Sequence, residues 1–174
     1  MRIIVASEHA GYELKELLYR YLRDQGHSVT RAGAISSAPV DYPPIAEEVA
    51  VRVTQGEFDC GILVCGTGIG VAIASGKVPG TRVALCLNDY MARMARAHND
   101  ANILCLGARV IGSGLAQAIV DAFLSTGFEG GRHVPRMEMV RALEEKYTNI
   151  RSSDRTDSAP GVGARPVGRN ARKE

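Results

Sequence analysis

No apolar run among the 174 residues approaches the ~20 residues needed to cross a bilayer, so we expect no membrane partner. The four cysteines, at positions 60, 65, 86 and 105, form no CxxC pair, which disfavours a zinc site. The first residues, MRIIVAS, lack the layout of a signal peptide, and the sequence has no internal repeat. These absences favour a cytoplasmic protein with reduced thiols.

The sequence has little net charge, because its 21 Lys and Arg residues are nearly balanced by 19 Asp and Glu residues. The positive excess belongs to residues 151–174, which are rich in Gly, Pro, Ser and Arg and have no apolar face. Such a segment cannot bury enough apolar surface to offset its ordering entropy. We therefore predict one domain over residues 1–150 and a disordered basic tail over 151–174. No aromatic residue interleaves the arginines of the tail, so a solvated tail is favoured over nucleic-acid binding.

Strand-like and helix-like segments alternate along the whole domain. Short apolar runs rich in β-branched residues predict strands at 2–7, 28–32, 60–64, 82–87 and 102–106. Amphipathic or small apolar segments predict helices at 14–22, 45–53, 71–74, 90–97, 115–124 and 135–147. This alternation predicts an α/β fold, a three-layer doubly wound Rossmann-like sandwich with a five-stranded parallel sheet. Ligands of such sheets bind beyond the carboxyl ends of the strands.

The central candidate site is the segment Cys65-Gly66-Thr67-Gly68-Ile69-Gly70, between a strand and a helix. Glycines at every second position let the backbone turn sharply and bring its N–H groups close to an anion. The segment is neither a P-loop nor a GxGxxG fingerprint, and a tight turn without a ligand stays an alternative. Cys65 could be an ordinary buried apolar side chain, but a thiolate is stabilised at this position before a helix.

Further polar candidates lie in other connections. Glu8 and His9 follow the first strand, and His98 and Asn99 lie between a helix and the fifth strand. A histidine at a helix end can simply cap it, so the role of His98 stays open on this ground. Arginines such as those flanking the start of the last helix can hold a phosphate with bidentate hydrogen bonds, or remain as exposed charges.

Five motifs in order resemble those of the type B ribose-5-phosphate isomerases, a family that includes the galactose-6-phosphate isomerase subunits. The resemblance covers residues 1–148 and leaves the tail outside. It is carried by Glu8-His9-Ala10-Gly11, Asp41-Tyr42-Pro43, Cys65-Gly66-Thr67-Gly68-Ile69-Gly70, His98-Asn99-Asp100-Ala101-Asn102 and Gly130-Gly131-Arg132-His133.

The resemblance implies an aldose–ketose isomerase that interconverts D-ribose 5-phosphate and D-ribulose 5-phosphate through a cis-enediolate, in the non-oxidative pentose phosphate pathway. It implies that Cys65 is the base, that Thr67 moves the hydroxyl proton, and that His98 assists ring opening. Some family members use a Glu after the glycine loop, but Val71 stands at that position. The implied substrate-binding residues are Glu8, His9, Tyr42, Gly66, Gly68, Gly70, Asn99, Arg109, Arg132 and Arg136.

The resemblance also implies that no metal or organic cofactor is used, and that a homodimer draws each site from both subunits. The sequence does not decide between a dimer and a tetramer. Glu8 replaces the Asp that is usual in the family. That change leaves open an isomerase that prefers a six-carbon 6-phosphate, such as allose or galactose 6-phosphate. A non-catalytic sugar-phosphate-binding module is the alternative from another class.

Overall fold

A computed structural model describes residues 1–153 of the chain. The last helix, α6, extends from Val134 to Ser153 and so includes the first three residues of the predicted tail. The rest of that tail lies outside the described residues. No helix in the described part of the chain is both long enough and apolar enough to span a membrane.

The five strands form one parallel sheet, as predicted, and their order in it is β2-β1-β3-β5-β4. The strand order changes direction between β1 and β3, so the connections that follow these two strands leave on opposite faces and lie side by side. Doubly wound sheets bind their ligands at this switch point. The central strands β1, β3 and β5 are almost wholly buried because helices cover both of their faces. The strands are β1 (Arg2–Ser7), β2 (Ser28–Gly33), β3 (Cys60–Cys65), β4 (Val83–Leu85) and β5 (Ile103–Gly107).

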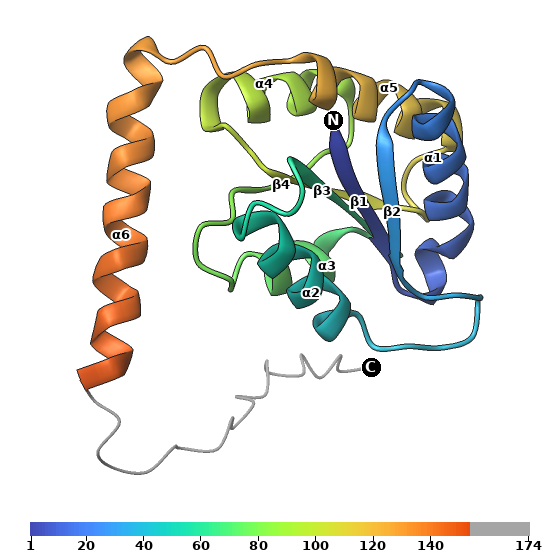
Figure 1. Ribbon diagram of the computed structural model, residues 1–174, viewed down its shortest axis with the longest axis horizontal. Helices are drawn as coiled ribbons and strands as arrows, with labels where there is room; N and C mark the ends of the chain where they lie inside the picture. Colours follow the sequence, from blue (N-terminus) through green and yellow to red (C-terminus); the bar gives the residue numbers. More distant parts are fainter. Residues whose placement is uncertain (154–174) are drawn as a thin grey trace, which may run out of the picture.

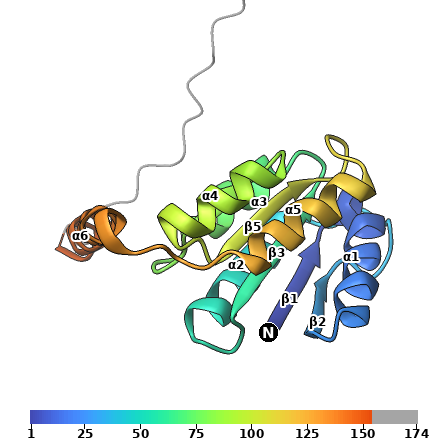
Figure 2. The same ribbon diagram turned by 90° about the horizontal axis from the view of Figure 1, so that it is seen from above.

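Two helical layers enclose the sheet (Figures 1 and 2). Helices α1 (Tyr12–Asp24), α4 (Asp89–Asn99) and α5 (Ser113–Ser125) pack on one face, where aliphatic side chains surround Phe123. Helices α2 (Tyr42–Thr54) and α3 (Ile69–Ser75) pack on the other, in the apolar cluster that includes Cys65. Alternate residues of β3 enter the two clusters, as the period of a strand requires.

Helix α6 stands apart from these layers (Figures 1 and 2). The 3-10 turn η2 (Gly131–His133) precedes it, and a second such turn, η1 (His9–Gly11), follows β1. Several large apolar side chains of α6 are exposed, among them Met139, Leu143 and Tyr147. An amphipathic helix normally buries its apolar face, whereas these side chains of α6 remain exposed in the single chain.

Most predicted boundaries differ from the structure by a residue or more, and three of these differences are informative. Helix α2 begins at Tyr42, three residues early, because prolines at its first positions need no N–H partner. Strand β4 is only three residues long because it is an edge strand that pairs with β5 alone. His98 and Asn99 belong to the end of α4 rather than to a connection, and α4 ends at Asp100 in a left-handed conformation.

Candidate active site

Cys65 is the last residue of β3, and its thiol faces the glycine loop. Its Sγ accepts a hydrogen bond from the Gly68 N–H at 3.0 Å, and only 6% of the residue is exposed. Gly68 adopts φ +80°, a conformation that side chains disfavour, and this turn directs its N–H back at the sulfur. The sulfur is thus held by a backbone donor of the glycine loop, at the carboxyl end of β3.

The other three cysteines differ from Cys65 in their surroundings. Burial raises the pKa of Cys60 to about 12 and that of Cys86 to about 11. Burial also raises the pKa of Cys105 far above its ordinary value. These thiols stay protonated at neutral pH and serve as small apolar side chains.

The end of β5 holds the glycine loop in place. The Ala108 N–H donates to the Cys65 carbonyl, and the Arg109 N–H donates to the Gly66 carbonyl, both at 2.9 Å. The Arg109 guanidinium then lies over Gly66, with Nη1 3.7 Å from where a Cβ would stand. These contacts place an arginine beside the backbone N–H groups of the loop, which together favour an anion.

Sequence reasoning missed Gly107, which lets β5 approach this loop. A Cβ on Gly107 would lie 2.7 Å from both the carbonyl carbon and oxygen of Thr67. The available signal was a glycine directly after the apolar run of a strand, which often marks a close backbone approach.

Tyr42 reaches the same loop from the start of α2. Its ring packs on Gly70, where an added Cβ would lie 3.0 Å from the Cζ atom. The side chain is 39% exposed, so its hydroxyl end remains accessible to a ligand.

Glu8 and His9 directly follow β1, at the start of the 3-10 turn η1. Oε2 of Glu8 lies 2.7 Å from Nδ1 of His9 and accepts the Ala10 N–H at 3.0 Å. Ala10 is also adjacent to Gly66, so this turn borders the cysteine loop. Oε1 of Glu8 is buried and has no hydrogen-bond partner among residues 1–153. Buried acceptors are normally paired, so this oxygen is suited to a hydroxyl of a bound molecule.

The remaining predicted residues form a second group, on α4, η2 and α6. The rings of His98 and His133 stack with centroids 4.2 Å apart, and Nε of Arg132 lies 3.4 Å from Nε2 of His133. Asn99 contacts Met137 of α6, and Arg136 is exposed on the same helix. Burial, assisted by His98 and the two arginines, lowers the pKa of His133, so this imidazole is neutral at pH 7.

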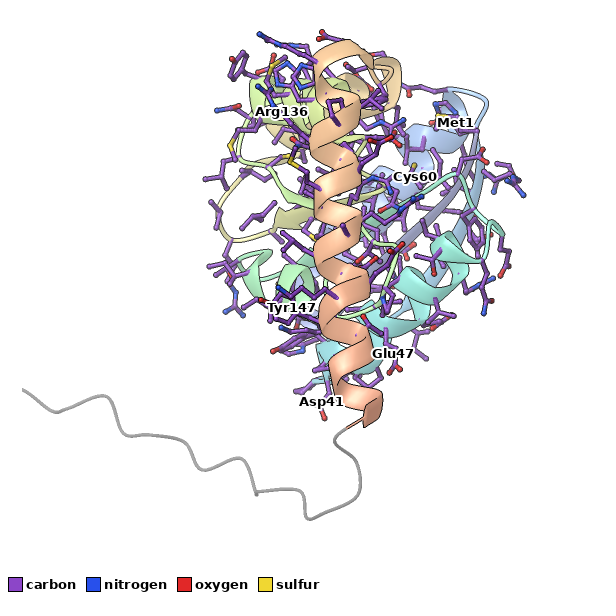
Figure 3. The ribbon with its side chains drawn as sticks, turned by 90° about the vertical axis from the view of Figure 1, so that its left-hand side faces the viewer. Met1, Asp41, Glu47, Cys60, Arg136 and Tyr147 are labelled. Atoms are coloured by element: carbon purple, nitrogen blue, oxygen red, sulfur yellow. The ribbon has the colours of Figure 1, made fainter. Side chains whose placement is uncertain are left out.

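The two groups lie at opposite edges of the sheet. Gly61 pairs with Ile103 near the edge where α4 ends, and Cys65 pairs with Gly107 at the other edge. Four steps along a strand separate these edges by roughly 13 Å. Figure 3 likewise shows Arg136 and Asp41, the neighbour of Tyr42, at opposite ends of the molecule. One chain therefore brings Glu8, His9, Tyr42, Cys65–Gly70 and Arg109 together, and separately His98, Asn99, Arg132 and Arg136.

The second group also offers a candidate metal site. Ligand atoms of His98, Glu129 and His133 all lie within 4.8 Å of one another. The charge of Arg132 beside His133 opposes a cation there and favours an anion such as a phosphate group.

A doubly wound sheet with a thiol and a glycine loop at its carboxyl edge defines an α/β protein with a candidate site for a small anionic ligand. A family described as ribose/galactose isomerase matches residues 3–140. Ribose-5-phosphate isomerase B of Escherichia coli K12 is 43% identical over 145 residues, which is 83% of this chain and 97% of that protein. The chain belongs to the ribose/galactose isomerase family.

Solved structures agree with this assignment. Ribose-5-phosphate isomerase B of Clostridium thermocellum is 49% identical, with a TM-score of 0.83 over 84% of this chain and 99% of that one. The Mycoplasma genitalium enzyme, solved with bound ribulose-5-phosphate, is 39% identical, with a TM-score of 0.80 over 83% and 97% of the two chains.

Proposed function

We propose that this protein is an aldose–ketose isomerase that interconverts D-ribose 5-phosphate and D-ribulose 5-phosphate, with Cys65 as the base. The observation that carries the proposal is the Gly68 N–H held 3.0 Å from the Cys65 sulfur in a chain of this family. Proton abstraction beside a carbonyl requires a base that is ionised near neutral pH and fixed donors for the oxyanion that forms.

The proposed reaction moves two protons and no metal or organic cofactor takes part. The Cys65 thiolate removes the C2 proton of the open-chain aldose, and the electrons form the C1–C2 double bond of a cis-enediolate. Backbone N–H groups of Gly66–Gly70 hold the two oxygens, and Thr67 transfers the hydroxyl proton from O2 to O1. The Cys65 thiol then returns its proton to C1, which completes the ketose and regenerates the thiolate.

A complete site requires two subunits. The base and its glycine loop lie at one edge of the sheet, whereas the proposed ring-opening residue His98 and the proposed phosphate ligands Arg132 and Arg136 lie roughly 13 Å away along the strands. A second chain that packs through the exposed apolar face of α6 would supply the missing group. We therefore propose a homodimer in which the cysteine half of each site meets the histidine–arginine half of the partner.

The first experiment is kcat/KM of the purified protein on ribose 5-phosphate and on allose 6-phosphate. Strong preference for the pentose supports the proposal and makes Glu8 a tolerated replacement for Asp. Preference for the hexose would assign Glu8 to a six-carbon substrate. Turnover of neither sugar, with binding of both retained, would favour the non-catalytic binding module.

A mixing experiment tests the shared site. Cys65→Ser and His98→Ala chains are each expected to be inactive, but a mixed dimer contains one site with both wild-type residues. Unfolding and refolding an equal mixture should restore about a quarter of wild-type activity, since half of the dimers are mixed and each has one intact site. Absence of any restored activity, with mixed dimers demonstrated by mass, would place the whole site within one chain.

A further inference from the structure

Asp100 has a left-handed backbone conformation, which is uncommon for residues other than glycine. It adopts φ 44° and ψ 44° at the end of α4, and it is the only non-glycine residue with positive φ in the described part of the chain. Glycine is the usual residue at such a helix end because it has no Cβ to strain. A side chain at this position makes contacts that glycine could not make.

The Asp100 carboxylate joins two arginines from different segments. Oδ2 accepts a hydrogen bond from Nη2 of Arg82 at 2.8 Å, and Oδ1 accepts one from Nη1 of Arg96 at 3.3 Å. Arg82 also donates through Nε to the Asp100 carbonyl at 2.6 Å. All three side chains keep partial exposure, and ion pairs of this kind contribute little to the stability of a fold. Stability therefore gives a poor account of the strained residue.

The same contacts hold the connection that carries His133. Arg96 donates through Nε to the Thr126 carbonyl at 3.4 Å, and the Glu129 N–H donates to the Ala97 carbonyl at 3.0 Å. The end of α4 and the segment before η2 are thus fixed to each other, and His98 stacks on His133 between them. Asp100 lies two residues after His98, so its two arginine contacts set the direction in which α4 presents that ring.

We infer that Asp100 is a positioning residue, which with Arg82 and Arg96 fixes His98 for the ring-opening step. This inference rests on the proposed function, in which His98 acts on the ring and Cys65 acts on the C–H bonds. Loss of the Asp100 carboxylate should then impair ring opening and leave the proton transfers at Cys65 intact.

The test uses two assays on Asp100→Gly, which removes the carboxylate and also the backbone strain. The first assay is isomerisation from ribose 5-phosphate, which requires ring opening. The second is deuterium exchange at C1 of ribulose 5-phosphate in D2O, followed by NMR. Ribulose 5-phosphate is acyclic because its C5 oxygen carries the phosphate, so its exchange needs only the enediolate chemistry.

We expect the kcat of isomerisation for Asp100→Gly to fall about tenfold, with deuterium exchange retained to within about twofold. Asp100→Asn, which keeps one oxygen acceptor, should fall between this variant and the wild type. The melting temperature of Asp100→Gly should stay within about 3 °C of wild type, since strain relief offsets the lost ion pairs. Asp59→Asn removes a comparable ion pair to Arg2, of 2.6 Å, and should leave both assays unchanged.

His98→Ala separates failure of this inference from failure of the proposed function. If wild type isomerises and His98→Ala loses isomerisation but keeps exchange, the role of His98 stands. An Asp100→Gly protein that then keeps full isomerisation, or that loses both activities equally, overturns the positioning role. Absence of isomerisation by the wild type would instead overturn the proposed function itself.

Discussion

Gly107→Ala adds one methyl group at the point where β5 meets the glycine loop. The new Cβ would stand 2.7 Å from the carbonyl carbon and oxygen of Thr67 and 3.0 Å from its Cα. All three are backbone atoms, so no rotation of a side chain can relieve the contact. The loop, with Thr67 at its centre, must move away from β5.

The size of the displacement follows from contact distances. Carbon atoms pack at roughly 3.5 Å or more, so Thr67 must shift by roughly 0.8 Å. A misplacement of this order in a catalytic group can cost about 100-fold in rate. Overpacking should also reduce the free energy of unfolding by about 1–3 kcal/mol. We therefore expect kcat/KM on ribose 5-phosphate to fall by about 100-fold in a protein that still folds.

The assay is steady-state isomerisation at 25 °C, below the melting temperature measured for each variant by circular dichroism. Gly114→Ala is the matched control, because no atom beyond its chain neighbours and the backbone of its own helix lies within 4 Å of the Cβ it would add. It should keep wild-type kcat/KM. A folded Gly107→Ala protein with full activity would refute the reasoning, since the position of Thr67 would then not limit the reaction.

Three further predictions concern other parts of the two half-sites. Cys65→Ser should lower kcat by at least about 100-fold, because an aliphatic hydroxyl ionises far less readily than a thiol and supplies almost no anionic base at neutral pH. Arg136→Ala should raise KM more than it lowers kcat, because phosphate binding is largely equal in the ground and transition states. The pKa of His133 is lower in the folded protein than its ordinary value of 6.5. As the pH falls through that value, the unfolded state therefore binds more protons than the folded state does. Stability should therefore decline between pH 7.5 and 5.5, and less so in His133→Gln, as measured by urea unfolding.

Each of these predictions has a control and a contrary outcome. Cys86→Ala removes a buried thiol outside the loop and should keep its kcat, whereas undiminished turnover by Cys65→Ser would exclude Cys65 as the base. Arg141→Ala changes an exposed arginine of the same helix and should leave KM unchanged. A fall in kcat alone for Arg136→Ala would contradict phosphate binding. An equal acid sensitivity in His133→Gln would assign the loss of stability to other groups.

The order and type of the main elements could be predicted from the sequence. Apolar runs of four to six residues and helical periodicity are local signals, and they predict all five strands and six helices of residues 1–153. The loop from Cys65 to Gly70 was recognisable for the same reason, since its glycines follow a buried strand directly. The residues at which elements end are harder to predict from local signals. His98 and Asn99, for example, were expected in a connection but form the last turn of α4.

Tertiary structure decided how the site residues are distributed. A chain contains no local signal for which edge of a sheet a residue reaches, since that depends on strand order and on the direction of each helix. The sequence assigned Tyr42 and Asn99 to one substrate site without dividing them between subunits, and the fold holds one against Gly70 and the other beside Met137. Close approaches such as that of Gly107 to Thr67 join segments forty residues apart, and only packing reveals them. Local sequence was thus sufficient to select the candidate residues of each group, and the geometry that separates the two groups came from the folded sheet.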